Sequence, residues 1–334
     1  MRAVRITAWS SPTDLAVSTV EPPACSPEQV RIRMRAAPVT FALSLLVTGK
    51  YQRKPALPFV PGNTIAGEII EVGADAGRGL KPGQRVVASM EYGGLAEEAC
   101  APAVNVYPIP DTMDFAEAAA LNTSYNSVLA ALTWARLLNV TPGSTLLITG
   151  AAGCAGIAAL ELAKALGVKV IAVASSEAKR AFLRDRGADA VIGSAPDRLK
   201  EEVLRATAGE GVDCALDTVG GAMFDQALRC LKAEGRILPL GFASGNIPNI
   251  PANLIMVKNI SVVGLYMGYY KIDQRLKFEP QVRAIFDRLG QMYVQGQIRP
   301  PIAARFPLER VANAFRRVLD RETIGHVVVT LEAP

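Results

Sequence analysis

The feature that most restricts the fold is a strict alternation of apolar strands and helical segments between residues 145 and 264. Strands are expected at 145–149, 168–174, 190–192, 212–217, 235–240 and 260–264, and helices at 156–166, 176–186, 197–207 and 223–231. Continuous apolar strands separated by helices of about ten residues are typical of a parallel sheet that is covered on both faces. This part of the chain is therefore predicted to be a doubly wound parallel sheet.

The parts of the chain on either side of this region have a different sequence pattern. Up to about residue 115 the chain is rich in Pro and Gly turns between short strands, predicted at 30–34, 65–73 and after the Pro82-Gly83 turn, which favours a compact antiparallel, barrel-like domain. Helices follow at 115–121 and 127–138. After residue 280 we expect a long helix, a short helix and a terminal strand at 326–330 that rejoins the first domain. Residues 1–122 and 269–334 are thus predicted to form one domain, with 123–268 inserted.

Composition excludes several classes of function. The 334 residues contain one histidine, His326, which disfavours multi-histidine metal sites, and no metal site is expected. The five cysteines include no C-x-x-C pair, so we expect small buried thiols rather than disulfides. The net charge of +5 comes from scattered basic residues, which does not indicate a nucleic-acid surface. No apolar run is long enough to span a membrane and the N-terminus does not read as a signal peptide, so a cytoplasmic protein is expected.

A glycine-rich turn connects the first predicted strand of the doubly wound sheet to its helix. The segment 150–156 reads Gly-Ala-Ala-Gly-Cys-Ala-Gly. Small residues at this position let backbone N–H groups and the helix N-terminus approach a pyrophosphate, so Gly150, Ala152, Gly153, Cys154 and Ala155 are predicted to bind a dinucleotide. The alternative is a tight turn without a ligand.

The end of the second strand indicates which dinucleotide is bound. A site for NAD usually has Asp or Glu here, whereas this chain has Ser175, Ser176, Lys179 and Arg180. Hydroxyls and cations suit a 2′-phosphate, so Ser175, Ser176 and Lys179 predict NADPH as the cofactor. The alternative is that Ser176 only caps the helix and that the cations are surface residues.

With these motifs in place, the chain resembles the zinc-independent medium-chain dehydrogenase/reductases, in particular the NADPH:quinone oxidoreductase and enoyl-thioester reductase branches. The resemblance covers nearly the whole length and is carried by the following motifs: Pro58-Phe59-Val60-Pro61-Gly62, Lys81-Pro82-Gly83-Gln84-Arg85-Val86, Tyr92-Gly93-Gly94, Asp217-Thr218-Val219-Gly220-Gly221 and Gly241-Phe242-Ala243-Ser244-Gly245. It implies a GroES-like β-barrel catalytic domain with an inserted Rossmann domain, and a homodimer. The His-Glu pair and the four-cysteine lobe of the zinc-dependent relatives are missing here.

The resemblance also implies site residues. Phe242, Ala243 and Ser244 are expected to pass the nicotinamide, and Ser127 matches a hydroxyl that touches the cofactor, although it could equally cap the following helix. Tyr51 matches the tyrosine that supplies or orients a proton in the enoyl reductases, with a cleft-lining aromatic as the alternative.

The resemblance breaks down at the family's usual Asn and Asp, which are replaced by Thr40 and Leu43. Thr40 still carries a hydrogen-bond donor, whereas Leu43 does not. We expect an NADPH-dependent enzyme that passes a hydride to a small electrophilic acceptor, a quinone or an α,β-unsaturated carbonyl or enoyl thioester, without a metal. The alternative is an NADP(H)-binding redox sensor or structural protein with weak or lost catalysis.

Overall fold

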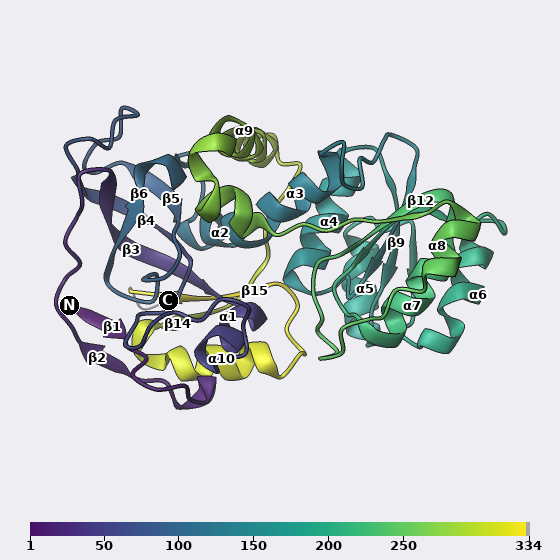
Figure 1. Ribbon diagram of the computed structural model, residues 1–334, viewed down its shortest axis with the longest axis horizontal. Coiled ribbons are helices and arrows are strands. Elements are labelled where there is room, and N and C mark those ends of the chain that lie inside the picture. Colours follow the sequence, from purple (N-terminus) through teal and green to yellow (C-terminus); the bar gives the residue numbers. More distant parts are fainter. Residues whose placement is uncertain (332–334) are drawn as a thin grey trace. The chain divides into compact units, whose positions relative to one another are not determined.

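The computed structural model describes residues 1–331 and divides them into two units (Figure 1). Unit 1 comprises residues 1–123, 267–295 and 300–331, and unit 2 comprises residues 124–266 and 296–299. The segment 296–299, which the sequence analysis assigns to the first domain, clusters with the second unit. Each unit is described by itself below.

Unit 2 contains the parallel sheet. Its strands are β8 (Thr145–Thr149), β9 (Lys169–Val173), β10 (Ala190–Ile192), β11 (Val212–Asp217), β12 (Leu231–Pro239) and β13 (Ser261–Val262). They are joined in the order β10-β9-β8-β11-β12-β13, and every pair is parallel. The chain runs from β8 outward to β10 and then returns to β11 to build the other half. This order confirms the predicted doubly wound sheet, with its switch point between β8 and β11.

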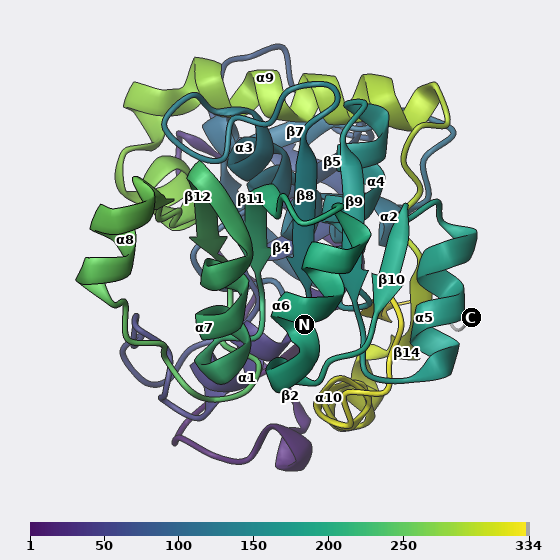
Figure 2. The same ribbon diagram turned by 90° about the vertical axis from the view of Figure 1, so that its right-hand side faces the viewer.

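The helices of unit 2 cover both faces of this sheet. They are α3 (Asn126–Thr133), α4 (Cys154–Ala165), α5 (Glu177–Asp185), α6 (Pro196–Ala206), α7 (Gly221–Cys230) and α8 (Ala252–Lys258). Because right-handed crossovers run in opposite directions from the switch point, α4 and α7 lie on opposite faces of the sheet. Figure 2 shows α6 and α7 in front of the strands, and α7 packs against β8, β11 and β12.

Unit 1 contains a seven-stranded sheet. Its strands are β3 (Gln29–Val39), β4 (Thr64–Val72), β5 (Arg85–Ser89), β6 (Glu98–Pro102), β7 (Val106–Pro108), β14 (Ile302–Pro307) and β15 (His326–Thr330), in the order β14-β15-β3-β4-β5-β7 with β6 also paired to β3. A separate small sheet joins β1 (Arg2–Val4) and β2 (Val17–Thr19). The terminal strand β15 pairs with β3, which confirms that the chain returns to its first domain.

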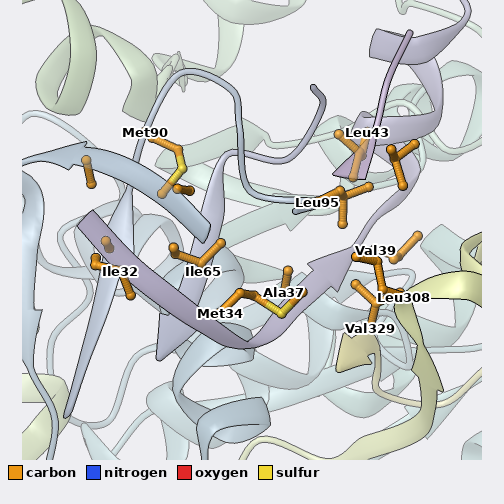
Figure 3. Close-up of a cluster of buried hydrophobic side chains, with 14 of the residues drawn as sticks. Ile32, Met34, Ala37, Val39, Leu43, Ile65, Met90, Leu95, Leu308 and Val329 are labelled. Atoms are coloured by element: carbon orange, nitrogen blue, oxygen red, sulfur yellow. The ribbon is translucent and has the colours of Figure 1, made fainter. Parts of the chain in front are cut away.

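The described helices of unit 1 longer than one turn are α1 (Phe41–Val47), α2 (Phe115–Ala120), α9 (Arg275–Val294) and α10 (Val311–Leu319). Alternate side chains of the strands point inward and form an apolar core, to which α1 adds Leu43 and the terminal strand adds Val329 (Figure 3). Met34 and Ile65, on β3 and β4, are fully buried in this core. The core therefore joins elements from both ends of the chain.

Several local predictions were wrong for identifiable reasons. The helix expected over 127–138 ends at Thr133, because Trp134 is extended; Leu137 and Leu138 are buried in a turn instead. The helix expected from Gly156 begins two residues earlier, at Cys154. The first domain is not purely antiparallel, because β14 pairs in parallel with β15. All five cysteines are free as predicted, but only Cys214 and Cys230 are buried.

Candidate functional site

The glycine turn lies at the carboxyl end of β8, beside the switch point. Gly150 has φ +63°, and a Cβ there would lie 2.4 Å from Thr218 Oγ1. A Cβ at Gly156 would lie 2.5 Å from the Ala151 Cα atom. Both positions therefore require glycine, one for its backbone conformation and both for space. The turn fits closely against its neighbours and exposes its backbone at Gly153.

Helix α4 opens directly out of this turn. Gly153 is its N-cap, and the first intrahelical hydrogen bond runs from Ile157 N to Gly153 O at 2.9 Å. The N–H groups before this bond, at Cys154 and Ala155 among others, belong to the end of a helix that attracts anions. Desolvation raises the pKa of the half-buried Cys154 thiol to about 12, so the thiol adds no negative charge there. This geometry suits an anionic ligand at the helix N-terminus.

The loop after β9 presents hydroxyls at the start of α5. Ser175 and Ser176 are exposed, and Ser176 caps the helix by accepting a hydrogen bond from Lys179 N at 3.3 Å. Ser176 is therefore the N-cap of α5, and its hydroxyl proton remains able to donate outward. Arg180 Nη1 donates to the carbonyl oxygens of Ala174 and Ser175 at 3.3 and 3.2 Å. This holds the guanidinium at the same strand end.

The loop after β12 carries Phe242, Ala243 and Ser244. Ala243 N donates to Thr218 O at 3.1 Å, and Ser244 N donates to Val219 O at 2.9 Å. The loops that follow β11 and β12 are therefore joined by backbone hydrogen bonds. Because all strands of the sheet are parallel, both loops lie at the same edge as the glycine turn, where ligands of such sheets gather.

Asp217 is a part of this edge that the sequence analysis did not single out as a site residue. It ends β11 and is fully buried, and its carboxyl accepts hydrogen bonds from Thr149 Oγ1 and from Gly220 N, the latter at 2.8 Å. Burial raises its pKa, while these hydrogen bonds act in the opposite direction. The signal in the sequence was an acidic residue at the end of a predicted buried strand, because a carboxylate is costly to bury unless it is paired.

Ser127 lies within α3, in its first turn. Its hydroxyl donates to Ser124 O at 3.0 Å, and the N-cap of this helix is Tyr125, which makes no side-chain cap. The alternative that Ser127 caps the helix is therefore wrong. The side chain is half-buried in unit 2.

In unit 1, Thr40 begins a helix that the sequence analysis did not predict. Its Oγ1 accepts a hydrogen bond from Leu43 N at 3.1 Å and caps α1. Leu43 is buried in the core of the unit. The two substitutions therefore have local roles, because one caps a helix and the other fills space. The Thr40 hydroxyl is half-buried and keeps its own proton to donate.

Tyr51 follows α1 and is half-buried against the same core. The N–H groups of Lys50 and Tyr51 both donate to Leu45 O, at 2.8 and 3.1 Å. Gly49 has φ +69°, and a Cβ there would lie 2.9 Å from the ring of Trp9. The backbone that carries Tyr51 is thus fixed by hydrogen bonds on one side and by an aromatic ring on the other.

Two further features concern metals and membranes. Within residues 1–331, no three His, Cys, Asp or Glu side chains are grouped so that they could hold a metal ion. None of the helices in that range is both long and apolar enough to cross a bilayer.

Comparison with known families gives two matches, one on each side of the boundary between the two units near residue 123. Residues 26–111 match the alcohol dehydrogenase GroES-like domain, and residues 154–282 match the family described as zinc-binding dehydrogenase. The first match lies in unit 1 and the second lies largely in unit 2. Together with the strand order, they confirm the predicted GroES-like domain and Rossmann domain.

Individual relatives extend over most of the chain. A quinone oxidoreductase-like protein 2 homolog from Nematostella vectensis is 40% identical over 305 residues, which cover 90% of this chain and 81% of the relative. A probable oxidoreductase from Mycobacterium abscessus has a crystal structure with a TM-score of 0.86 and 34% identity, covering 99% of this chain and 98% of that one. A mycobacterial protein crystallised with NADPH has a TM-score of 0.91 and 25% identity, covering 99% and 100%. The chain therefore belongs to the medium-chain dehydrogenase/reductase family, among its quinone oxidoreductase-like members.

Proposed function

We propose that this protein is an NADPH-dependent oxidoreductase that reduces a quinone or an α,β-unsaturated carbonyl compound or enoyl thioester. The observation that carries the proposal is the glycine turn at the switch point of the parallel sheet, where Gly150 leaves no room for a Cβ and α4 directs its N-terminus outward. This arrangement suits the pyrophosphate of a dinucleotide. The mycobacterial structure crystallised with NADPH supports the choice of cofactor.

We assign the binding of the cofactor to residues of unit 2. The turn at 150–155 would hold the pyrophosphate, and the loop 242–244 would pass the nicotinamide, as the family resemblance implies. Ser175, Ser176 and Lys179 lie at the start of α5, where two hydroxyls, an ammonium group and a helix N-terminus can all stabilise a 2′-phosphate. Ser127 completes the proposed set. When bound, NADPH supplies the hydride, and the chain's residues supply orientation and charge stabilisation.

The acceptor side of the reaction is assigned to unit 1. Tyr51 has a phenol that can donate a proton or a hydrogen bond to an acceptor oxygen as negative charge develops on it. Its rigid backbone favours such a role, because a positioned donor stabilises charge without reorganising during the reaction. Thr40 can contribute a second donor through its hydroxyl. Leu43, in the usual aspartate position, offers none.

The proposed reaction needs no metal. In the segment where zinc-dependent relatives have their His-Glu pair, this chain has Asn63 and Thr64. Thr64 is buried and its Oγ1 accepts a hydrogen bond from Asn122 Nδ2 at 3.2 Å. The position is therefore part of a polar network of the core. Elemental analysis of the purified protein, with turnover measured before and after chelation, tests this part of the proposal.

We also propose a homodimer that forms through the edge of the parallel sheet. The last strand, β13, pairs with β12 on one side and ends the sheet on the other. Beside it in the chain, α8 has no buried residue, and Met256 and Val257 are both 72% exposed. A second copy of the same edge is a suitable partner, because antiparallel pairing of two identical edges closes with twofold symmetry. Light scattering checks this, because Val257→Asp should place a charge in the interface and shift the protein from dimer to monomer.

The cytoplasmic location expected from the sequence stays a prediction.

Stopped-flow oxidation of NADPH against a panel of quinones, enones and enoyl thioesters tests the main proposal. We expect rapid oxidation with at least one class, and a larger rate with NADPH than with NADH. The use of Thr40 as a helix cap and the apolar Leu43 also favour a second candidate, a redox sensor that binds NADP(H) with little turnover. Tight NADPH binding without oxidation by any acceptor would identify the sensor.

A further inference from the structure

The side chains of Thr149 and Asp217 connect the two strands that border the switch point. The Thr149 hydroxyl, at the end of β8, donates to Asp217 Oδ1, at the end of β11. The same oxygen of Thr149 accepts a hydrogen bond from Thr218 N at 3.3 Å. Both side chains are fully buried. The Thr149 hydroxyl therefore both donates and accepts a hydrogen bond at the boundary between β8 and β11, where the two halves of the sheet meet.

The carboxyl group of Asp217 also fixes the loop that follows β11. Its Oδ2 accepts from Gly220 N at 2.8 Å, and its Oδ1 accepts from Val219 N at 3.4 Å. Gly220 has φ +75°, and a Cβ there would lie 2.6 Å from Asn246 O. The loop is thus held in a conformation that lets the segment after β12 lie against it.

The Thr218 side chain links this arrangement to the glycine turn. Its hydroxyl donates to Thr149 O at 2.9 Å. The same hydroxyl oxygen occupies the place that a Cβ of Gly150 would need. The space available to the turn therefore depends on where Thr218 is held, and Thr218 is held by Thr149. Through the backbone hydrogen bonds from Ala243 and Ser244, the loop after β12 depends on the same residues.

We propose that Asp217 and Thr149 are positioning residues that hold the three loops in the shape that receives the pyrophosphate and nicotinamide of NADPH. The inference rests on the proposed function, because it takes NADPH to be the ligand. A buried polar pair carries a desolvation cost that an apolar pair of equal size avoids. In return, its directional hydrogen bonds fix one conformation of the loops. Loops that are ordered in advance lose less entropy when the ligand binds, which raises the affinity.

The test compares Thr149→Val, which removes both hydrogen bonds of the hydroxyl and keeps its shape, with Thr149→Ser, which keeps the hydroxyl. The matched control is Thr145→Val, at the opposite end of the same strand. Dissociation constants for NADPH and NADH are measured by cofactor fluorescence. We expect Thr149→Val to raise both constants about tenfold, a loss of about 1.4 kcal/mol of binding free energy, and Thr149→Ser and Thr145→Val to stay within about twofold of the original chain.

Hydrogen exchange of the cofactor-free protein gives an independent measurement. In Thr149→Val, peptides that cover 150–156, 218–221 and 242–246 are expected to exchange faster, while a peptide over β10 keeps its rate. A lower melting temperature with unchanged dissociation constants and unchanged loop exchange would overturn the proposal, because it would show a role in the core alone. Loss of affinity in Thr149→Ser equal to that in Thr149→Val would also overturn it.

A second variant guards against a chain that does not fold. Thr218→Val removes only the half-buried hydroxyl next to Gly150. It should raise the dissociation constants of NADPH and NADH by a factor that lies between those of the two Thr149 variants. If the original chain fails to bind NADPH at all, the proposed function is wrong. If it binds NADPH and neither Thr149→Val nor Thr218→Val alters the affinity, the function stands and the positioning role is refuted.

Discussion

Lys271 Nζ lies 3.1 Å from Asn122 Oδ1, and both side chains are buried in unit 1. Asn122 Oδ1 also accepts from Ser89 Oγ at 3.0 Å, and its Nδ2 donates to Thr64 Oγ1 and Ala88 O. The ammonium group therefore shares an amide oxygen in the core, where burial lowers its pKa to about 7.

This low pKa predicts a pH-dependent stability. The unfolded chain binds the proton up to the ordinary lysine pKa of 10.5, whereas the folded chain releases it near pH 7. The free energy of unfolding should therefore rise between pH 7 and pH 9, by about 2 kcal/mol from this group. Lys271→Met should remove that rise. Urea unfolding of both chains at the two pH values checks it, and parallel curves would contradict it.

Burial of His326 predicts a loss of stability at acidic pH. It is 1% exposed on β15, and burial lowers its pKa to about 4. Because the unfolded chain takes up the proton near pH 6.5, stability should fall as the pH drops from 6.5 towards 4, by about 2 kcal/mol between pH 7.5 and 5. His326→Gln should show a smaller loss. Thermal or urea unfolding at pH 5 and 7.5 measures it, and an equal loss in the variant would contradict the assignment.

Adding one methyl group at Gly150 should have a large effect on cofactor affinity and stability. Gly150→Ala places a Cβ 2.4 Å from Thr218 Oγ1 at φ +63°, so the turn must shift. We expect NADPH affinity to fall by about tenfold or more and stability to fall by about 1–3 kcal/mol. Gly143→Ala is the matched control, since Gly143 also has positive φ but a Cβ there meets nothing within 4 Å. Equal cofactor affinity in the two variants would exclude a close-fitting turn.

Lys179 predicts a selective effect on the phosphorylated cofactor. If its ammonium group stabilises the 2′-phosphate, Lys179→Ala should raise the KM for NADPH about tenfold and leave the KM for NADH nearly unchanged. Steady-state kinetics with both cofactors measures this. The same increase for NADPH and NADH would show that Lys179 does not contact that phosphate.

Tyr51 predicts an effect on turnover. Tyr51→Phe keeps the ring and its packing against the core and removes the phenolic proton. We expect kcat with enoyl substrates to fall by about 10²-fold, within the usual range for a positioned acid, while the NADPH dissociation constant is retained. Unchanged turnover would make Tyr51 an aromatic that only lines the pocket.

Regular elements with a strong local pattern were predictable from sequence. The limits of β8, β10, β11 and β15 are those expected, because each is a short apolar run bounded by turn residues. Helices α1 and α8 were not predicted. Helix α1 is seven residues long and reads as an apolar run, and its start depends on the Thr40 cap.

The candidate site was predictable where one segment carries the signal. The turn at 150–156 and the hydroxyls at 175–176 are local in sequence, and the structure places them at the ends of adjacent strands. Asp217 and Thr149 are 68 residues apart, and their hydrogen bond follows from the parallel register of β8 and β11. Strand order is a tertiary property, so no local pattern could show that these two side chains meet.

The pairing of β15 with β3 has a consequence for how the protein is made. The six strands of the parallel sheet lie between residues 145 and 262, so all of them are synthesised before β14 and β15. The sheet of unit 1 is different, because β3 can pair with β4 and β6 early, whereas the part of β3 around Val39, which lies opposite Val327, has no partner until β15 is made. The nascent chain must keep this part of β3 from pairing elsewhere until β15 has been synthesised.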